Sequence, residues 1–182
     1  CKRLQRSGLM TEVAPYRELL DWVIDPAGDY GVAPGVWVRE KPGATEALLV
    51  FTPEDGGFWI SIDLLHGYLR DEPWHIVYLR DGIGCFHMAG IDGLAPDYAG
   101  CVQALKVLLE RLGAKQVYCL GGSAGGYAAL RYGLDLNAKA VASFSGPTSL
   151  VPAHWDDAHR PFLEPLAERA PDMLQDLEPF YR

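Results

Sequence analysis

A serine between closely spaced glycines is the feature of this sequence best suited to do chemistry. Gly121, Ser123 and Gly125 match the pattern G-x-S-x-G, and the flanking residues predict a strand before the turn and a helix after it. A serine on such a sharp turn has a strained backbone, and flanking glycines remove side chains that would clash. The pattern predicts a nucleophilic Ser123 whose oxyanion is stabilised by the backbone N–H of Ala124, at the start of the helix.

Two other interpretations of this turn stay open. A Gly-Ser turn can simply pack a helix tightly against a sheet, without any chemistry. A phosphate-binding loop is the second, although neither a Gly-Lys-Ser/Thr sequence nor a G-x-G-x-x-G pattern opens the helix. We favour the nucleophile because strand, turn and helix follow one another as this motif requires.

Alternating strand and helix patterns position this turn. The continuous apolar run 47–51 is typical of a strand buried on both faces of a parallel sheet. We expect an α/β fold, with a mostly parallel sheet and helices on both faces. The predicted strands are 36–40, 46–51, 74–81, 116–120 and 138–145; the predicted helices are 16–24, 58–70, 96–112 and 127–134, the last ending near Gly133.

The loop after the strand at 46–51 offers a second oxyanion donor. In a parallel sheet this loop lies near the Ser123 turn. Pro53 has no N–H, so Thr52 or Glu54 is the candidate donor. The loop can equally be an ordinary connection between two elements.

The histidines that precede Ser123 give a weaker indication of function. His87 lies in a glycine-rich loop, which can line a pocket, although packing is its simpler role. A metal-dependent hydrolase would use His66, His75 or His87, but these residues show no H-E-x-x-H or comparable spacing. We therefore expect no metal and no cofactor.

Composition limits the class of protein. A chain of 182 residues with 49% hydrophobic and 22% charged residues suits one ordinary globular domain. A net charge of −8 argues against nucleic acid or an anionic membrane as partner, and no apolar run is long enough to span a bilayer. The four cysteines (Cys1, Cys85, Cys101 and Cys119) have no metal-binding or disulfide spacing, which makes the cytoplasm the expected compartment.

The sequence pattern changes after residue 148. Prolines recur and no strand pattern remains, so we expect short helices at about 162–170 and 171–177. We interpret residues 1–182 as a single domain, with a core at about 36–148 and connecting or cap helices at 149–182.

The layout from about Trp37 to Thr148 resembles the α/β-hydrolase superfamily. The most specific part of this resemblance is Tyr118 to Thr148, where the serine turn, the helix and the following strand come in the expected order. It implies nucleophilic acyl transfer on a small-molecule ester or related acyl compound: Ser123 attacks a carbonyl carbon, a histidine takes its proton, and a carboxylate orients that histidine.

The sequence departs from this superfamily after the serine, because the acid and the histidine normally follow on later strands. His154 and His159 are the histidines after Ser123, and no recognisable strand carries them. If the chain is complete, we predict His159 as the base and Asp156 as the acid. The simpler expectation is a truncated chain, with acid and base beyond Arg182.

Two functions from different classes therefore compete. The first is a serine hydrolase acting through Ser123. The second is a non-catalytic α/β-hydrolase-like module that binds a glycan or a protein partner, in which the glycines around Ser123 serve packing alone. Composition leaves the oligomeric state open.

Overall fold

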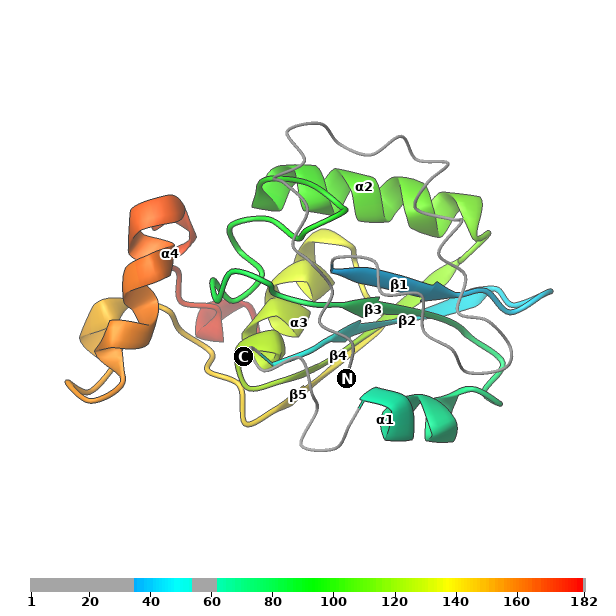
Figure 1. The fold of residues 1–182 in the computed structure, drawn as a ribbon, viewed down its shortest axis with the longest axis horizontal. Coiled ribbons are helices and arrows are strands. Elements are labelled where there is room, and N and C mark those ends of the chain that lie inside the picture. Colours follow the sequence, from blue (N-terminus) through cyan, green and yellow to red (C-terminus); the bar gives the residue numbers. More distant parts are fainter. Residues whose placement is uncertain (1–34, 54–61, 182) are drawn as a thin grey trace, which may run out of the picture.

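A five-stranded sheet forms the centre of the computed structural model, which describes residues 35–53 and 62–181 (Figure 1). Its spatial order is β1-β3-β2-β4-β5, with β1 antiparallel to β3 and all other neighbours parallel. The strands are β1 (Val36–Arg39), β2 (Glu46–Phe51), β3 (His75–Leu79), β4 (Gln116–Gly122) and β5 (Ala140–Phe144). The mostly parallel sheet predicted from the sequence is confirmed; the predicted helix at 16–24 lies outside the described residues.

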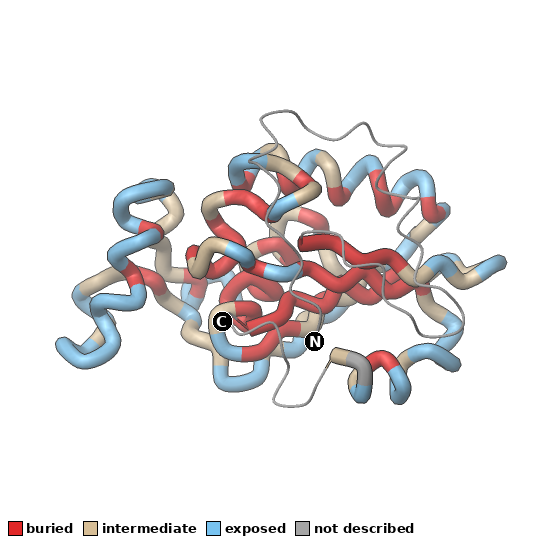
Figure 2. Tube along the Cα trace, in the orientation of Figure 1, coloured by how far each residue is buried: buried red, intermediate tan, exposed pale blue. Residues whose placement is uncertain are grey.

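Helices cover both faces of the sheet, as predicted. On one face α1 (Ile62–Leu69) packs with a cluster that includes Leu48 and Val50 of β2. On the other face, α2 (Tyr98–Arg111) and α3 (Ala124–Asp135) pack with the cluster that contains Leu49 and Phe51. Because successive side chains of a strand point to opposite faces, the apolar run of β2 supplies both clusters. Figure 2 shows β1, β2 and β3 as the buried centre of the molecule, whereas the residues of β5 are exposed or intermediate.

The end of α3 differs from the prediction. The helix continues through Gly133 to Asp135 instead of ending near the glycine. A Cβ at Gly133 would lie 2.5 Å from a methyl carbon of Val141. The glycine therefore allows α3 to approach β5 closely. Asn137, with a φ of 52°, adopts the left-handed conformation just beyond the helix end.

Residues 151–174 form an excursion from the sheet, at the end of the strands where α3 begins (Figure 1). Its neck is a short antiparallel contact in which Leu150 N donates to Gln175 O (2.9 Å) and Leu177 N donates to Thr148 O (2.8 Å). Leu163 and Leu166 are buried against the main core. The excursion and its return contain η2 (Pro152–His154), η3 (Arg160–Leu163), α4 (Glu164–Arg169), η4 (Pro171–Met173) and η5 (Glu178–Phe180).

None of the helices in the described part of the chain is long and apolar enough to cross a membrane.

Candidate active site

Ser123 occupies a strained turn between β4 and α3. Its backbone has φ 51° and ψ −123°, a region that side-chain-bearing residues rarely adopt. Two hydrogen bonds hold this conformation: Ser123 N donates to Phe144 O (2.9 Å), and Gly126 N donates to Ser123 O (2.8 Å). Ser123 is nevertheless exposed. The turn thus presents the serine to solvent at the end of the sheet, where the sequence pattern places a nucleophile.

The glycines around Ser123 have a steric reason to be there. A Cβ at Gly121 would overlap the backbone carbonyl of Gly125, and one at Gly126 would lie 2.6 Å from Ser143 Oγ. A real Cβ essentially never comes this close to another heavy atom. The closeness of β4, α3 and β5 therefore excludes side chains at these positions.

The N–H of Ala124 is suited to stabilise an oxyanion. Ala124 is the first residue of α3, so no carbonyl of its own helix can accept from its N–H. It also lines the same cleft as Ser123. The partial positive charge of a helix N-terminus favours negative charge at this position.

The structure does not support Thr52 as the second backbone donor. Thr52 is fully buried, and its N–H already donates to Leu79 O (2.9 Å). The N–H continues the hydrogen bonding between β2 and β3 by one residue and so does not face the cleft. Glu54, the other candidate, lies outside the described residues.

The cleft beside Ser123 has a volume of about 1160 Å³. Ser123 and Ala124 belong to the turn between β4 and α3, and most of the remaining wall comes from the loop after β5 and from the excursion. The lining residues are Gly84, Phe86, Ser123, Ala124, Ser145, Gly146, Pro147, Thr148, Ser149, His154, Trp155, Asp156, His159, Pro161, Phe162, Pro165 and Glu178.

Asp156 and His159, which the sequence analysis named as acid and base, both line this cleft and contact each other. His159 Nδ1 lies 2.8 Å from Asp156 Oδ1, and the backbone N–H of His159 donates to the same oxygen (2.9 Å). The hydrogen bond from His159 lowers the pKa of Asp156. Both side chains are well exposed, at 62% for His159 and 67% for Asp156. Within the described ranges, no hydrogen bond joins either residue to Ser123.

His154 is the second histidine of the cleft, and the sequence alone assigns it no role. His154 Nδ1 lies 2.7 Å from Ser149 Oγ, at the neck of the excursion. Ser149 was missed entirely, because nothing in its local sequence distinguishes it from a loop serine. The contact depends on the tight turn at η2, which brings residues 149 and 154 together.

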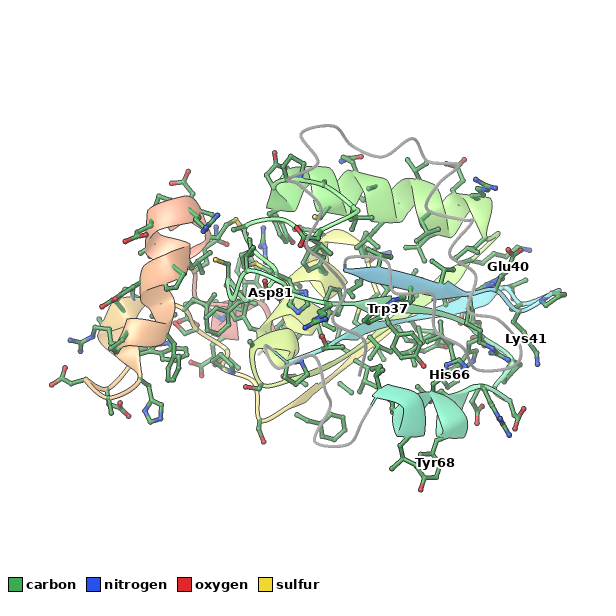
Figure 3. All side chains as sticks on the ribbon, in the orientation of Figure 1. Trp37, Glu40, Lys41, His66, Tyr68 and Asp81 are labelled. Atoms are coloured by element: carbon green, nitrogen blue, oxygen red, sulfur yellow. The ribbon has the colours of Figure 1, made fainter. Side chains whose placement is uncertain are left out.

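The three remaining histidines lie apart from Ser123 and from one another. His66 on α1 binds the hydroxyl of Tyr78 (3.0 Å), and His75 at the start of β3 binds Ala44 O (3.2 Å). Figure 3 shows His66 on the α1 side of the sheet, away from the end of β3 that carries Asp81. In the part of the chain that is described, no group of three His, Cys, Asp or Glu side chains could hold a metal ion.

His87 is buried behind the site and connects several elements. Its Nε2 lies 2.9 Å from Thr52 O, and since a carbonyl can only accept, Nε2 carries the proton. Burial lowers the pKa of His87, which keeps the ring neutral. Tyr132 of α3 donates to His87 O (3.0 Å). These bonds join the ends of β2 and β3 to the helix behind Ser123.

Asp81 organises the loop that carries His87, and the sequence did not single it out. Its carboxylate, 2% exposed, accepts from the backbone N–H groups of Ile83 (3.0 Å), Cys85 (2.7 Å) and His87 (2.8 Å). An acidic residue followed by glycines at the end of a buried strand was the available signal. Asp81 therefore stabilises the conformation of this loop through hydrogen bonds to its backbone.

Cys119, four residues before the serine, is a packing residue as expected. It is 2% exposed, and burial raises the pKa of its thiol to about 12. A thiol in this environment stays protonated and is a poor nucleophile.

Comparison with known proteins gives structural likenesses only. No protein-family model matches the chain, and no curated protein matches it. A capsule O-acetyltransferase of Neisseria meningitidis serogroup A is 18% identical with a TM-score of 0.50, over 80% of this chain and 63% of that structure. An α/β serine hydrolase homologue from Coxiella burnetii is 18% identical with a TM-score of 0.41, over 72% of this chain and 60% of that one. MenH from S. aureus is 17% identical with a TM-score of 0.44, over 64% of this chain and 44% of that structure.

The strand order, the helices on both faces and the serine turn between β4 and α3 are those of the α/β-hydrolase fold. The chain spans less than two thirds of the length of each of these three structures. At 18% identity, the likeness to the capsule O-acetyltransferase concerns the fold alone.

Proposed function

We propose that this protein is a serine hydrolase that cleaves an ester or related acyl bond of a small molecule. The observation that carries the proposal is Ser123, held at φ 51° on a strand-to-helix turn and exposed in a large cleft. Such strain persists only where the surrounding structure holds it in place, and it concentrates at functional sites. In the reaction, Ser123 Oγ bonds to the substrate carbonyl carbon and its proton passes to a base.

The rest of the reaction needs an oxyanion donor and a proton carrier. The Ala124 N–H would stabilise the negative charge that develops on the carbonyl oxygen. The bond to the leaving group then breaks, and the leaving group takes the proton from the base. Water hydrolyses the acyl-serine with the base acting again, which regenerates the Ser123 hydroxyl.

Two histidines of the cleft are the candidates for the base. All five histidines of the sequence are described, and His154 and His159 are the two that line the cleft. Asp156 binds Nδ1 of His159, the contact that an acid makes with a catalytic base. Since neither histidine bonds to Ser123 here, the nucleophile and the oxyanion donor carry the proposal without them.

Labelling with a fluorophosphonate probe tests the assignment of Ser123. We expect the probe to label the protein and the label to disappear in Ser123→Ala. Ser143→Ala is the matched control, because Ser143 lies nearby on β5 with a buried Oγ and does not line the cleft. Labelling or esterase activity that survives Ser123→Ala would refute the proposal.

A non-catalytic module that binds a glycan or a protein partner is the second candidate. The absence of a hydrogen bond from either cleft histidine to Ser123, within the described residues, favours it. A protein that binds a ligand in the cleft but never reacts with the probe would support this alternative.

We also propose a cytoplasmic location and a single domain. The described cysteines form no disulfide, which fits a reducing compartment.

A further inference from the structure

Phe86 closes one end of the Ser123 cleft. It lines the cleft but is 7% exposed, and it belongs to the main hydrophobic core. Its ring packs edge-on against the buried ring of Tyr127, with 6.5 Å between the ring centroids, and against that of Trp155 at 6.0 Å. Tyr127 lies in the first turn of α3, four residues after Ser123. Phe86 therefore fills the space between the helix that follows the serine and the excursion.

The backbone on both sides of Phe86 is held in place by hydrogen bonds. Phe86 has a φ of 56° and His87 a φ of 61°, the left-handed conformation that residues with a side chain rarely adopt. The carboxylate of Asp81 accepts from the N–H groups of the two neighbours of Phe86, Cys85 (2.7 Å) and His87 (2.8 Å). Such a conformation persists only where surrounding contacts hold it. The hydrogen bonds of Asp81 thus fix the place at which the Phe86 ring meets the cleft.

The excursion side of the cleft is more exposed and more polar than the Phe86 side. Phe162, an aromatic residue of the excursion that lines the cleft, is 55% exposed. The side chains of His154, Asp156 and His159 line the cleft from the same segment, and these residues are exposed as well. An alkyl chain is stabilised in proportion to the apolar surface that leaves water. It therefore gains more from contact with Phe86 than from contact with Phe162.

We propose that Phe86 is a specificity-determining residue, which ends the acyl-binding part of the cleft and limits the substrate to esters of short acyl chains. The proposal rests on the proposed function, because it names the substrate class of the Ser123 site. The acyl chain extends from Ser123 Oγ toward the ring of Phe86, and the leaving group extends toward the exposed excursion side. A longer acyl chain meets the Phe86 ring, so its last methylene groups are not buried.

Two esters with the same leaving group test this limit on acyl length. We expect the unmodified protein to cleave p-nitrophenyl butyrate with a higher kcat/KM than p-nitrophenyl hexanoate, whose acyl chain has two more methylene groups. Phe86→Ala opens the space that the ring occupies. We expect it to raise the hexanoate-to-butyrate ratio of kcat/KM about tenfold, since each newly buried methylene group contributes about fourfold. An unchanged ratio in a folded variant would overturn the proposal.

Two further variants separate acyl selection from a loss of stability. Phe86→Leu keeps most of the apolar volume in the core, and we expect it to raise the same ratio about threefold; if Phe86→Ala does not fold, this variant decides. Phe162→Ala is the matched control, because it removes the same ring from the exposed side of the cleft. We expect it to change both rates alike. A ratio that rises in Phe162→Ala but not in the Phe86 variants would contradict the proposal.

Binding separates failure of this proposal from failure of the proposed function. Butyranilide and hexananilide are amide analogues of the two esters, and titration calorimetry compares their affinities without turnover. If Phe86→Ala shifts the preference toward hexananilide but the fluorophosphonate probe never labels Ser123, the role of Phe86 stands and the hydrolase assignment fails. If Ser123 is labelled but neither Phe86 variant changes the ratio of the two esters, the hydrolase assignment stands and the role of Phe86 is refuted.

Discussion

Gly125 in the first turn of α3 lies directly against the carbonyl oxygen of Phe51 at the end of β2. A Cβ at position 125 would overlap this oxygen and lie 2.7 Å from the carbonyl oxygen of Thr52. Neither atom can move away easily, because both belong to the backbone at the end of a buried strand. The turn that carries Ser123 is thus pressed against the strand that precedes the predicted oxyanion loop.

The first prediction concerns this close approach. We expect Gly125→Ala to lower the free energy of unfolding by about 2–4 kcal/mol, because the backbone must shift to relieve the overlap. Gly67→Ala is the matched control. Gly67 lies inside α1 with nothing within 4 Å of an added Cβ, and alanine there should be neutral or stabilise by up to about 1 kcal/mol. Urea denaturation measures both; equal stability of the two variants would contradict the steric argument.

The second prediction concerns the carboxylate of Asp81. Asp81→Asn replaces one acceptor oxygen by an amide that must face a buried N–H donor. We expect a loss of about 1–3 kcal/mol of stability. Asp97→Asn provides the comparison, since Asp97 caps α2 by accepting from Gly100 N (2.7 Å), and asparagine caps helices equally well. Thermal or urea unfolding that shows the two variants equally stable would mean that the Asp81 hydrogen bonds contribute little.

The third prediction is a pH dependence that comes from His87. Its pKa is lowered from 6.5 in the folded protein by burial, so below that value the unfolded chain binds more protons than the folded one. The contribution of His87 is therefore fully present above the unfolded pKa. It is lost as the pH falls toward the folded pKa, with a slope of at most about 1.4 kcal/mol per pH unit.

The variant His87→Gln keeps a donor for Thr52 O but does not titrate. Between about pH 7 and pH 5, we expect its stability to fall less steeply than that of the unmodified protein. Urea denaturation at several pH values measures this slope. Identical slopes for the two proteins would show that another group controls the acid sensitivity.

The fourth prediction concerns the two histidines of the cleft. His154 contacts Ser149, five positions before it, and His159 contacts Asp156, three positions before it. Neither histidine bonds to Ser123 in the described part of the chain. We therefore expect His154→Ala and His159→Ala each to keep the rate of Ser123 labelling within about threefold, since a general base contributes at least about 100-fold. A loss of that larger size in His159→Ala alone would assign the base to the Asp156–His159 pair.

Much of the fold was predictable from local sequence. The continuous apolar run of β2, the helical spacing of α2 and the glycines around Ser123 depend on backbone geometry and on periodicity. These signals are carried by residues close together in the chain. They were sufficient for the parallel sheet, for the helices on both faces and for the serine turn.

The tertiary structure decided what depends on segments far apart in the sequence. Gly133 looked like a helix end but permits contact with β5, and Thr52 looked like a donor to the cleft but bonds to Leu79. The hydrogen bonds of Asp81 and His87 depend on tertiary structure, because they connect the loop after β3 with the end of β2 and with α3. The sequence by itself determined which residue types occupy the serine turn. The packing of strands, helices and excursion decided which of their polar groups face the cleft, because each hydrogen bond made in the interior removes a donor or an acceptor from the site.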